Sequence, residues 1–226
     1  MAKSAPKKSP KPAAARPTTV AAVASKKPRP TITALVRVKD EAAQLAACVE
    51  TALWCDEVLI WVQNTSTDST AKIAEALAKK HRNVRAVVHA YPWEVACTNQ
   101  GITAAKGPWI LLLDADERIP GALAQEIRRT IQNDTADYYR IPFDNYVGQR
   151  LVRYGWGAHF GVSSTAKLFR QGARVFKQGD VHPSSTFAGR DGGRLQHRMT
   201  HYMLRDLTHM IQLLNHYSSL HARSLA

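Results

Sequence analysis

The segment 109–117 joins a run of apolar residues to a group of acids that could bind a cation. Five apolar residues are followed by Asp114, Asp116 and Glu117. An unbroken apolar run is typical of a strand buried on both faces of a parallel sheet, and such sheets bind ligands at the carboxyl ends of their strands. Because acids gathered there repel one another, a divalent cation that carries a diphosphate is the natural ligand. The alternative is a set of acids favoured by the dipole of a helix that starts near Pro120.

Two other predicted strands also end in polar side chains. Residues 32–38 lead into Lys39-Asp40-Glu41, and residues 58–62 lead into the polar segment 63–68. In a parallel sheet these ends lie along one edge, together with the acids that follow residue 113. Each polar segment alone is explained equally well by a turn or a cap, but three at one edge favour a binding site.

The elements that would position these side chains alternate between strand and helix. The pattern predicts further strands over 84–88 and 138–142, and helices over 41–53, around Ile73–Leu77, over 94–105 and after Pro120. This alternation indicates an α/β fold with a mostly parallel central sheet. The chain has no Gly-x-Gly-x-x-Gly after its first strand and no Gly-Lys-Ser/Thr loop, which argues against a dinucleotide oxidoreductase and a P-loop protein.

The first 30 residues differ in composition from the rest of the chain. They hold six of the 11 prolines and eight Lys or Arg, with no acid. We expect a disordered basic tail, residues 1–30, followed by one domain, residues 31–226. Without the tail's eight cations the chain keeps 23 Lys and Arg against 18 acids, so the net charge falls from +13 to +5. The tail could touch nucleic acid, anionic lipid or an acidic partner, or simply aid solubility, and we expect no specific nucleic-acid binding by the domain.

The second half of the domain, residues 143–226, has weaker periodicity than the first half, residues 31–142. Residues 143–200 are rich in Gly, aromatics, Arg and His, which is typical of binding loops. Residues 203–221 predict an amphipathic helix packed on the domain, and membrane contact is the alternative. No apolar run reaches the length of a membrane span, and an odd number of cysteines, three, is most simply explained by reduced thiols in a cytoplasmic protein.

Several motifs together resemble those of the family 2 glycosyltransferases, and more narrowly the bacterial subgroup that builds the lipopolysaccharide inner core. The resemblance covers roughly residues 31–222. It rests on Lys39-Asp40-Glu41, Trp54-Cys55-Asp56-Glu57, the segment 63–70, Asn99-Gln100-Gly101, Asp-Ala-Asp-Glu-Arg at 114–118, Lys167-Leu168-Phe169-Arg170, Val181-His182, His197, His201-Tyr202 and the segment 215–219.

This resemblance implies a GT-A fold, a Rossmann-like architecture, and an inverting transfer of sugar from a nucleotide diphosphate sugar to a glycan or glycolipid acceptor. It implies a cytoplasmic enzyme that could contact the cytoplasmic face of the inner membrane. It places Mg²⁺ or Mn²⁺ on Asp116, with His182 as a second ligand. The residues expected to bind the nucleotide sugar are Val36, Val38, Glu41, Gln63, Asp68, Asn99, Asp114 and Arg170.

Two departures from the family pattern affect the expected chemistry. Gln63 stands where the family has an aspartate that binds the nucleobase, although an amide can still pair with a base edge. Pro183 follows His182 where the family has a glutamate, and an inverting transfer needs a general base. Asp180 and Glu117 are the candidate substitutes. The lost glutamate also motivates a second hypothesis, a non-catalytic protein that binds a nucleotide sugar or glycan.

The pair His197 and His201 has the spacing of a zinc-binding pair on a helix. No glutamate directly follows His197, and Arg198 is an unfavourable neighbour for a cation. We therefore expect a packing role for both histidines.

Overall fold

The computed structural model describes residue 1 and residues 29–91, 95–133, 135–154, 163–177, 184–204 and 206–224. Most of the expected tail, together with Asp180 and His182, lies outside these ranges.

Four parallel strands form the part of the sheet that the sequence predicts best. They are β1 (Ile32–Val38), β2 (Glu57–Gln63), β3 (Val84–His89) and β4 (Trp109–Asp114). Their order in the sheet is β3-β2-β1-β4, and all three pairings are parallel. The carboxyl ends of β1, β2 and β4 therefore meet at one edge, as expected, and the predicted α/β class is confirmed.

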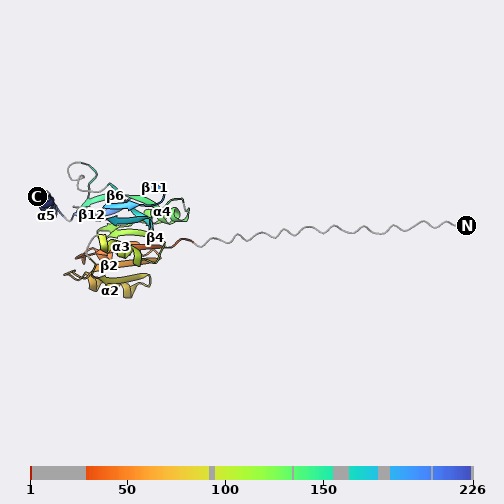
Figure 1. Ribbon diagram of the computed structural model, residues 1–226, viewed down its shortest axis with the longest axis horizontal. Coiled ribbons are helices and arrows are strands. Elements are labelled where there is room, and N and C mark those ends of the chain that lie inside the picture. The colour runs from red at the N-terminus through yellow and green to blue at the C-terminus, as the bar shows by residue number, and fades with distance from the viewer. Residues whose placement is uncertain are drawn as a thin grey trace.

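Helices cover both faces of these strands because alternate strand residues point to opposite sides. The larger core cluster packs one face against α1 (Leu45–Ala52), α2 (Thr70–Lys80) and α4 (Gly121–Gln132). The smaller cluster packs the other face against α3 (Val95–Ala104). Val36 and Leu113 belong to the first cluster, whereas Leu35 and Leu112 belong to the second. Figure 1 shows α2 at the end of the stack of strands that holds β2.

The second half of the chain extends the same sheet, where we expected mainly loops. β6 (Tyr138–Val147) and β8 (Ser164–Arg170) continue it beyond β4, followed by β12 (Met199–Leu204) and β5 (Glu117–Arg118). Two short strands, β7 (Arg150–Leu151) and β11 (Asp191–Arg194), pair with β6, and β9 (Arg174–Lys177) and β10 (Ser184–Phe187) form a separate hairpin. The expected boundary at residue 142 thus falls inside β6. The strands β7, β9, β10 and β11 have two to four residues each, which is too few for the alternation that identifies a strand from sequence.

The C-terminal helix α5 (Leu207–Ser224) forms as predicted but does not pack as predicted. Met203 belongs to β12, and Met210 is buried. In contrast, Ile211 is 63% exposed and Leu214 is 42% exposed. Figure 1 shows α5 standing beyond the end of β12, apart from the rest of the sheet. The predicted packing on the domain is therefore found at Met210 but not at Ile211 or Leu214, because helical periodicity gives the apolar face but not what covers it. None of the helices in the described ranges has both the length and the hydropathy needed to cross a bilayer.

A buried carboxylate fixes the opposite, amino-terminal edge of the parallel strands. Glu57 is 7% exposed and begins β2. Its Oε2 accepts hydrogen bonds from Thr33 Oγ1 and Lys106 N, both at 2.8 Å, and its Oε1 accepts one from Arg85 Nε at 3.0 Å. One side chain therefore joins β1, β2, β3 and the loop that precedes β4.

We expect Glu57→Gln to lower the free energy of unfolding by about 2–4 kcal/mol, because a buried ion pair is broken and an NH₂ group faces donors. Urea unfolding followed by circular dichroism measures this loss. The matched control is Glu75→Gln, which removes an exposed pair with Lys79 and should cost less than about 0.5 kcal/mol. Equal losses for the two variants would contradict this role of Glu57.

Candidate functional site

Side chains tie the loops after β1 and β2 together at the carboxyl edge. Asp40 adopts a left-handed backbone with φ of 55°, and its Oδ1 accepts a hydrogen bond from Thr67 N at 2.6 Å. Asp68 Oδ2 accepts from Ala42 N at 2.9 Å, and its Oδ1 accepts from Thr70 N at 2.9 Å. These bonds to the charged form lower the pKa of both aspartates. Asp68, which we expected at the nucleoside, thus uses both oxygens to hold the loops.

Asp114 is held by two cations from different strands. Arg37 Nη2 lies 2.7 Å from its Oδ1, and Lys167 Nζ lies 2.7 Å from its Oδ2. Burial by itself would raise the pKa of Asp114, but Lys167 and Arg37 outweigh it and hold that pKa well below its usual range. Asp114 is therefore a fixed anion between β1 and β8.

Glu117 also contacts the ammonium group of Lys167. Lys167 Nζ lies 2.8 Å from Glu117 Oε1, and Glu117 Oε2 accepts a hydrogen bond from Asp114 N at 3.0 Å. Glu117 is 2% exposed, and burial raises its pKa against the opposing charge of Lys167. A general base must reach the acceptor hydroxyl. With both oxygens engaged and buried, Glu117 has a structural role in place of the base role that we expected.

Asp116 differs from both of these acids. Its Oδ1 is buried and has no hydrogen-bond partner among the described residues. Its Oδ2 lies 3.4 Å from His201 Nε2, and His201 Nδ1 lies 2.8 Å from Asn145 Oδ1. Burial lowers the pKa of His201, but the contact with Asp116 outweighs it and raises that pKa. Tyr202 N also donates to the Asp116 carbonyl at 2.9 Å, which holds this turn against β12.

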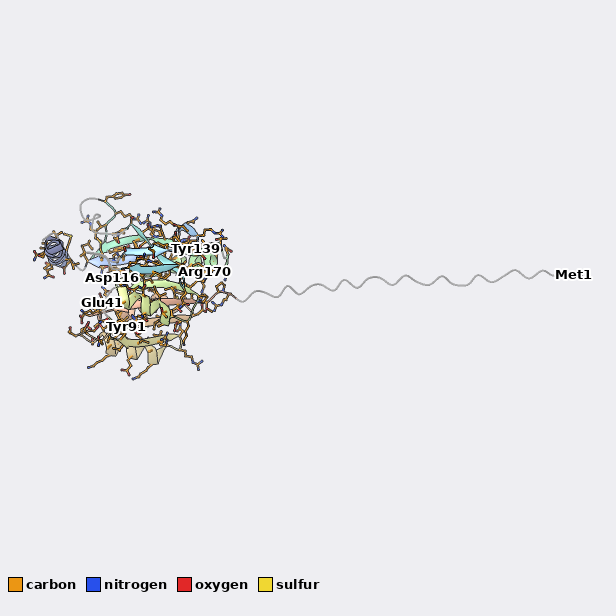
Figure 2. The ribbon with its side chains drawn as sticks, in the orientation of Figure 1. Met1, Glu41, Tyr91, Asp116, Tyr139 and Arg170 are labelled. Carbon is orange, nitrogen blue, oxygen red and sulfur yellow. The ribbon has the colours of Figure 1, made fainter. Side chains whose placement is uncertain are left out.

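Glu41 adds negative charge to the same edge. Figure 2 shows Glu41 and Asp116 on the same side of the molecule. Burial, together with repulsion by Asp116 and Asp114, raises the pKa of Glu41 to about 7. A carboxyl group that resists ionisation beside another carboxylate with an unpaired oxygen is the electrostatic signature expected of a cation site.

Asp116 and His201 are the described side chains best placed to hold a divalent cation. The orphaned Oδ1 of Asp116 is a hard oxygen ligand, which fits Mg²⁺ or Mn²⁺. In the described ranges no three His, Cys, Asp or Glu side chains gather closely enough to form a complete protein cage. Cations that bind diphosphates take few protein ligands and complete their shell with phosphate and water. The proposed ligand His182 lies outside the described residues.

The ends of β2 and β3 offer a place for a flat ring. Gln63 is 6% exposed, and its Oε1 has no partner in the described part of the chain. Trp61, His89 and Tyr91 form a stack, with centroids of Trp61 and His89 4.8 Å apart. The stack borders a cavity of about 470 Å³. An unpaired buried amide oxygen next to stacked aromatic rings suits a nucleobase edge.

Three more of the expected nucleotide-sugar residues, Val36, Val38 and Asn99, do not have side chains in position for that role. Val36 and Val38 are fully buried in the core, so only their backbone could face a ligand. The Asn99 amide is paired in both directions with the backbone of Phe176, at 2.9 and 3.0 Å, and so fastens α3 to β9.

Arg170 lies at the wrong end of the sheet. It pairs with Trp109, the first residue of β4, and its guanidinium stacks on that indole 4.6 Å from the ring centroid. Figure 2 shows it on the opposite side from Asp116 and Glu41. The prediction that Arg170 contacts the phosphates is therefore wrong. The motif gave its sequence position, but β8 runs antiparallel to β4 and carries its last residue away from the site.

Sequence reasoning missed the roles of Arg37, Lys167 and His201. Arg37 interrupts an apolar strand, and a charged residue at such a position must find a partner. That signal could have identified it. Lys167 lies in a quoted motif, but nothing local connects it to Asp114. We expected a packing role for His197 and His201, but each contacts an acid: His197 Nδ1 lies 2.8 Å from Glu126 Oε2, and His201 Nε2 lies 3.4 Å from Asp116 Oδ2.

Comparison with known proteins shows the family to which the chain is related. The model of glycosyl transferase family 2 matches residues 33–191. An uncharacterized glycosyltransferase of Rickettsia bellii is 32% identical over 110 residues, which cover 48% of this chain and 35% of the relative. The lipopolysaccharide core biosynthesis glycosyltransferase LpsC of Rhizobium meliloti is 23% identical over 203 residues, 86% of this chain and 72% of the relative. The chain thus spans only about a third of the length of the Rickettsia protein.

The fold has a counterpart among solved structures. The crystal structure of S. aureus TarS superposes with a TM-score of 0.50 at 16% identity, over 63% of this chain and 29% of TarS. The expected GT-A architecture is confirmed. The family model matches more than half of this chain, and an Asp-Ala-Asp segment lies at the carboxyl edge of the parallel sheet. The chain therefore belongs to glycosyl transferase family 2.

Proposed function

We propose that this protein transfers a sugar from a nucleotide diphosphate sugar to an acceptor hydroxyl, with a divalent cation held at Asp116. The observation that carries the proposal is the contrast between two acids in one turn. Asp114 is neutralised by Arg37 and Lys167, whereas Asp116 keeps a buried oxygen without a partner. The fixed anion of Asp114 beside the unpaired carboxylate oxygen of Asp116 suits a cation that carries phosphate. Family membership supports the same chemistry.

The cation would stabilise the leaving group. Mg²⁺ or Mn²⁺ bridging the diphosphate neutralises the negative charge that grows on the leaving group. Asp116 would hold it directly, and His201 would supply a second ligand. Asp114, whose oxygens each keep a lone pair, would contact the ribose or the cation's water shell.

The nucleobase would bind at Gln63 and at the aromatic stack of Trp61, His89 and Tyr91. An amide offers both a donor and an acceptor, so it can pair with the edge of uracil or of a purine. The buried, unpaired Oε1 of Gln63 requires a donor from the ligand, because a buried acceptor left unpaired costs free energy.

Transfer would proceed with inversion at the anomeric carbon. The acceptor oxygen attacks from the face opposite the diphosphate, the bond from carbon to the phosphate oxygen breaks, and the electron pair leaves with the nucleoside diphosphate. A base removes the acceptor proton. Of the two candidates from the sequence, Glu117 is engaged by Lys167, so Asp180 is the one that we retain.

The acceptor would be a glycan or glycolipid of the lipopolysaccharide core type. The support is the relationship to LpsC, which extends over most of this chain. We place the reaction in the cytoplasm, with a glycolipid acceptor reached at the membrane surface.

Two adjacent substitutions should separate chemistry from folding. Asp116→Asn should lower kcat/KM for metal-dependent transfer by roughly 100-fold or more, while the free energy of unfolding changes by less than about 0.5 kcal/mol. Glu117→Gln should lower the free energy of unfolding by about 2–4 kcal/mol, because it weakens a buried ion pair. Release of nucleoside diphosphate and urea unfolding measure the two effects.

Full activity of Asp116→Asn would contradict the proposal that Asp116 holds the cation. Metal-dependent binding of a nucleotide sugar without transfer to any acceptor would instead support the non-catalytic alternative.

The raised pKa of Glu41 predicts a pH dependence of stability. An acid whose pKa is higher in the folded state than in the unfolded chain loses stability as it ionises, so wild-type stability should fall between pH 5 and 8 without metal. Glu41→Gln removes this effect, and its stability relative to wild type should rise by roughly 1–2 kcal/mol over that range. Urea unfolding in EDTA at several pH values tests this. A difference that stays constant with pH would show that Glu41 is not repelled by the neighbouring acids.

A further inference from the structure

A second cavity, which we call the arginine pocket, lies on the far half of the sheet. It has a volume of about 250 Å³. Its walls include Arg153, Arg194, Arg198, Phe143, Asn145 and Tyr154. The three arginines come from separate segments, after β7, at the end of β11 and before β12, and the sheet pairings of β7, β11 and β12 with β6 bring them together. None of the three was singled out as a ligand from the sequence.

The arginine pocket carries more positive than negative charge. Asp144 is the carboxylate beside it, with Arg153 Nη2 2.9 Å and Arg198 Nε 3.8 Å from its Oδ1. Arg198 Nη1 also donates to the Phe143 carbonyl at 2.9 Å. The Arg194 guanidinium makes no recorded hydrogen bond or ion pair within the described ranges. Three guanidinium groups thus face one carboxylate, which leaves a local excess of two positive charges.

The arginine pocket connects to the proposed reaction centre through two side chains. Asn145 lines the pocket and lies 2.8 Å from His201, whose Nε2 lies 3.4 Å from Asp116. Phe143 borders the arginine pocket on one side and, on the other, a cavity of about 360 Å³ that is lined by Asp114 and Lys167. A ligand anchored at the arginines therefore lies next to the turn that carries Asp116, on the side away from Gln63.

We propose that the arginine pocket binds an anionic group, a phosphate or a carboxylate, on the acceptor sugar. This inference rests on the proposed function. Guanidinium groups match such oxyanions because their planar N–H forks can donate two parallel hydrogen bonds. Arg194 has no competing partner among the described side chains, while Asp144 positions Arg153 and Arg198. Phe143 and Tyr154 supply the apolar and aromatic surface on which a sugar ring packs. The enzyme is thereby selective for acidic acceptors over neutral ones.

Calorimetric titration of the full chain in EDTA, without donor, tests the arginine pocket independently of catalysis. The probes are glucose 6-phosphate, glucuronate and glucose. We expect both anionic sugars to bind more tightly than glucose, with an affinity that falls as salt is added. The tighter of the two identifies the preferred group, phosphate or carboxylate. Arg194→Gln should weaken binding of the anionic sugars at least tenfold.

The matched control is Arg129→Gln, which removes the same charge from the exposed face of α4 and should change affinity less than twofold. Asp116→Asn should also keep this binding while it loses sugar transfer, so failure of the pocket and failure of the proposed function are distinguishable. Equal binding of glucose and the anionic sugars would overturn the proposal. An unchanged affinity in Arg194→Gln would also overturn it. So would displacement of the sugar phosphate by UDP with Mn²⁺ in a parallel titration without EDTA, because that would place the anion in the donor site.

Discussion

The buried ammonium group of Lys167 is the contact on which the arrangement of the site depends. It lies 2.7 Å from Asp114 and 2.8 Å from Glu117, and so joins β8 to β4 and β5. Two carboxylates this close in a buried environment cannot both ionise without a cation between them. Arg37, from β1, completes the neutralisation of Asp114. The two halves of the chain therefore meet through charge as well as through the shared sheet.

The contacts of Lys167 and Arg37 give the neighbouring acids different roles. Asp114 and Glu117 have their charge neutralised within the fold, which leaves Asp116 as the acid in that turn whose oxygen needs an external partner. Burial, together with repulsion by Asp116 and Asp114, raises the pKa of Glu41 at the same edge. In the proposed function, a bound cation would relieve the repulsion between these carboxylates.

The predictable parts of the structure are those set by local pattern. Because β4 is buried on both faces, Trp109–Leu113 is a continuous apolar run. The spacing of apolar residues predicts the amphipathic helices α1, α2 and α4. Strands over 164–204 escaped this reasoning because their pairing with β4 and β6 is non-local. The motif at 167–170 was noticed, yet its two ends have unrelated roles: Lys167 enters the charge cluster, whereas Arg170 stacks on Trp109 at the far edge.

The sequence by itself determined the α/β class, the succession of the first strands and helices along the chain, and the edge at which the polar strand ends gather, because strand and helix periods are local properties of the chain. It also determined the family, through motifs that keep their spacing. Only the tertiary structure decided which acid of the Asp-Ala-Asp-Glu segment remains unpaired, because that depends on Arg37 and Lys167, which lie 77 and 53 positions from Asp114, and on His201, which lies 85 positions from Asp116. Long-range pairing of charges follows from how strands are ordered in the sheet, and no local pattern in the chain encodes that order.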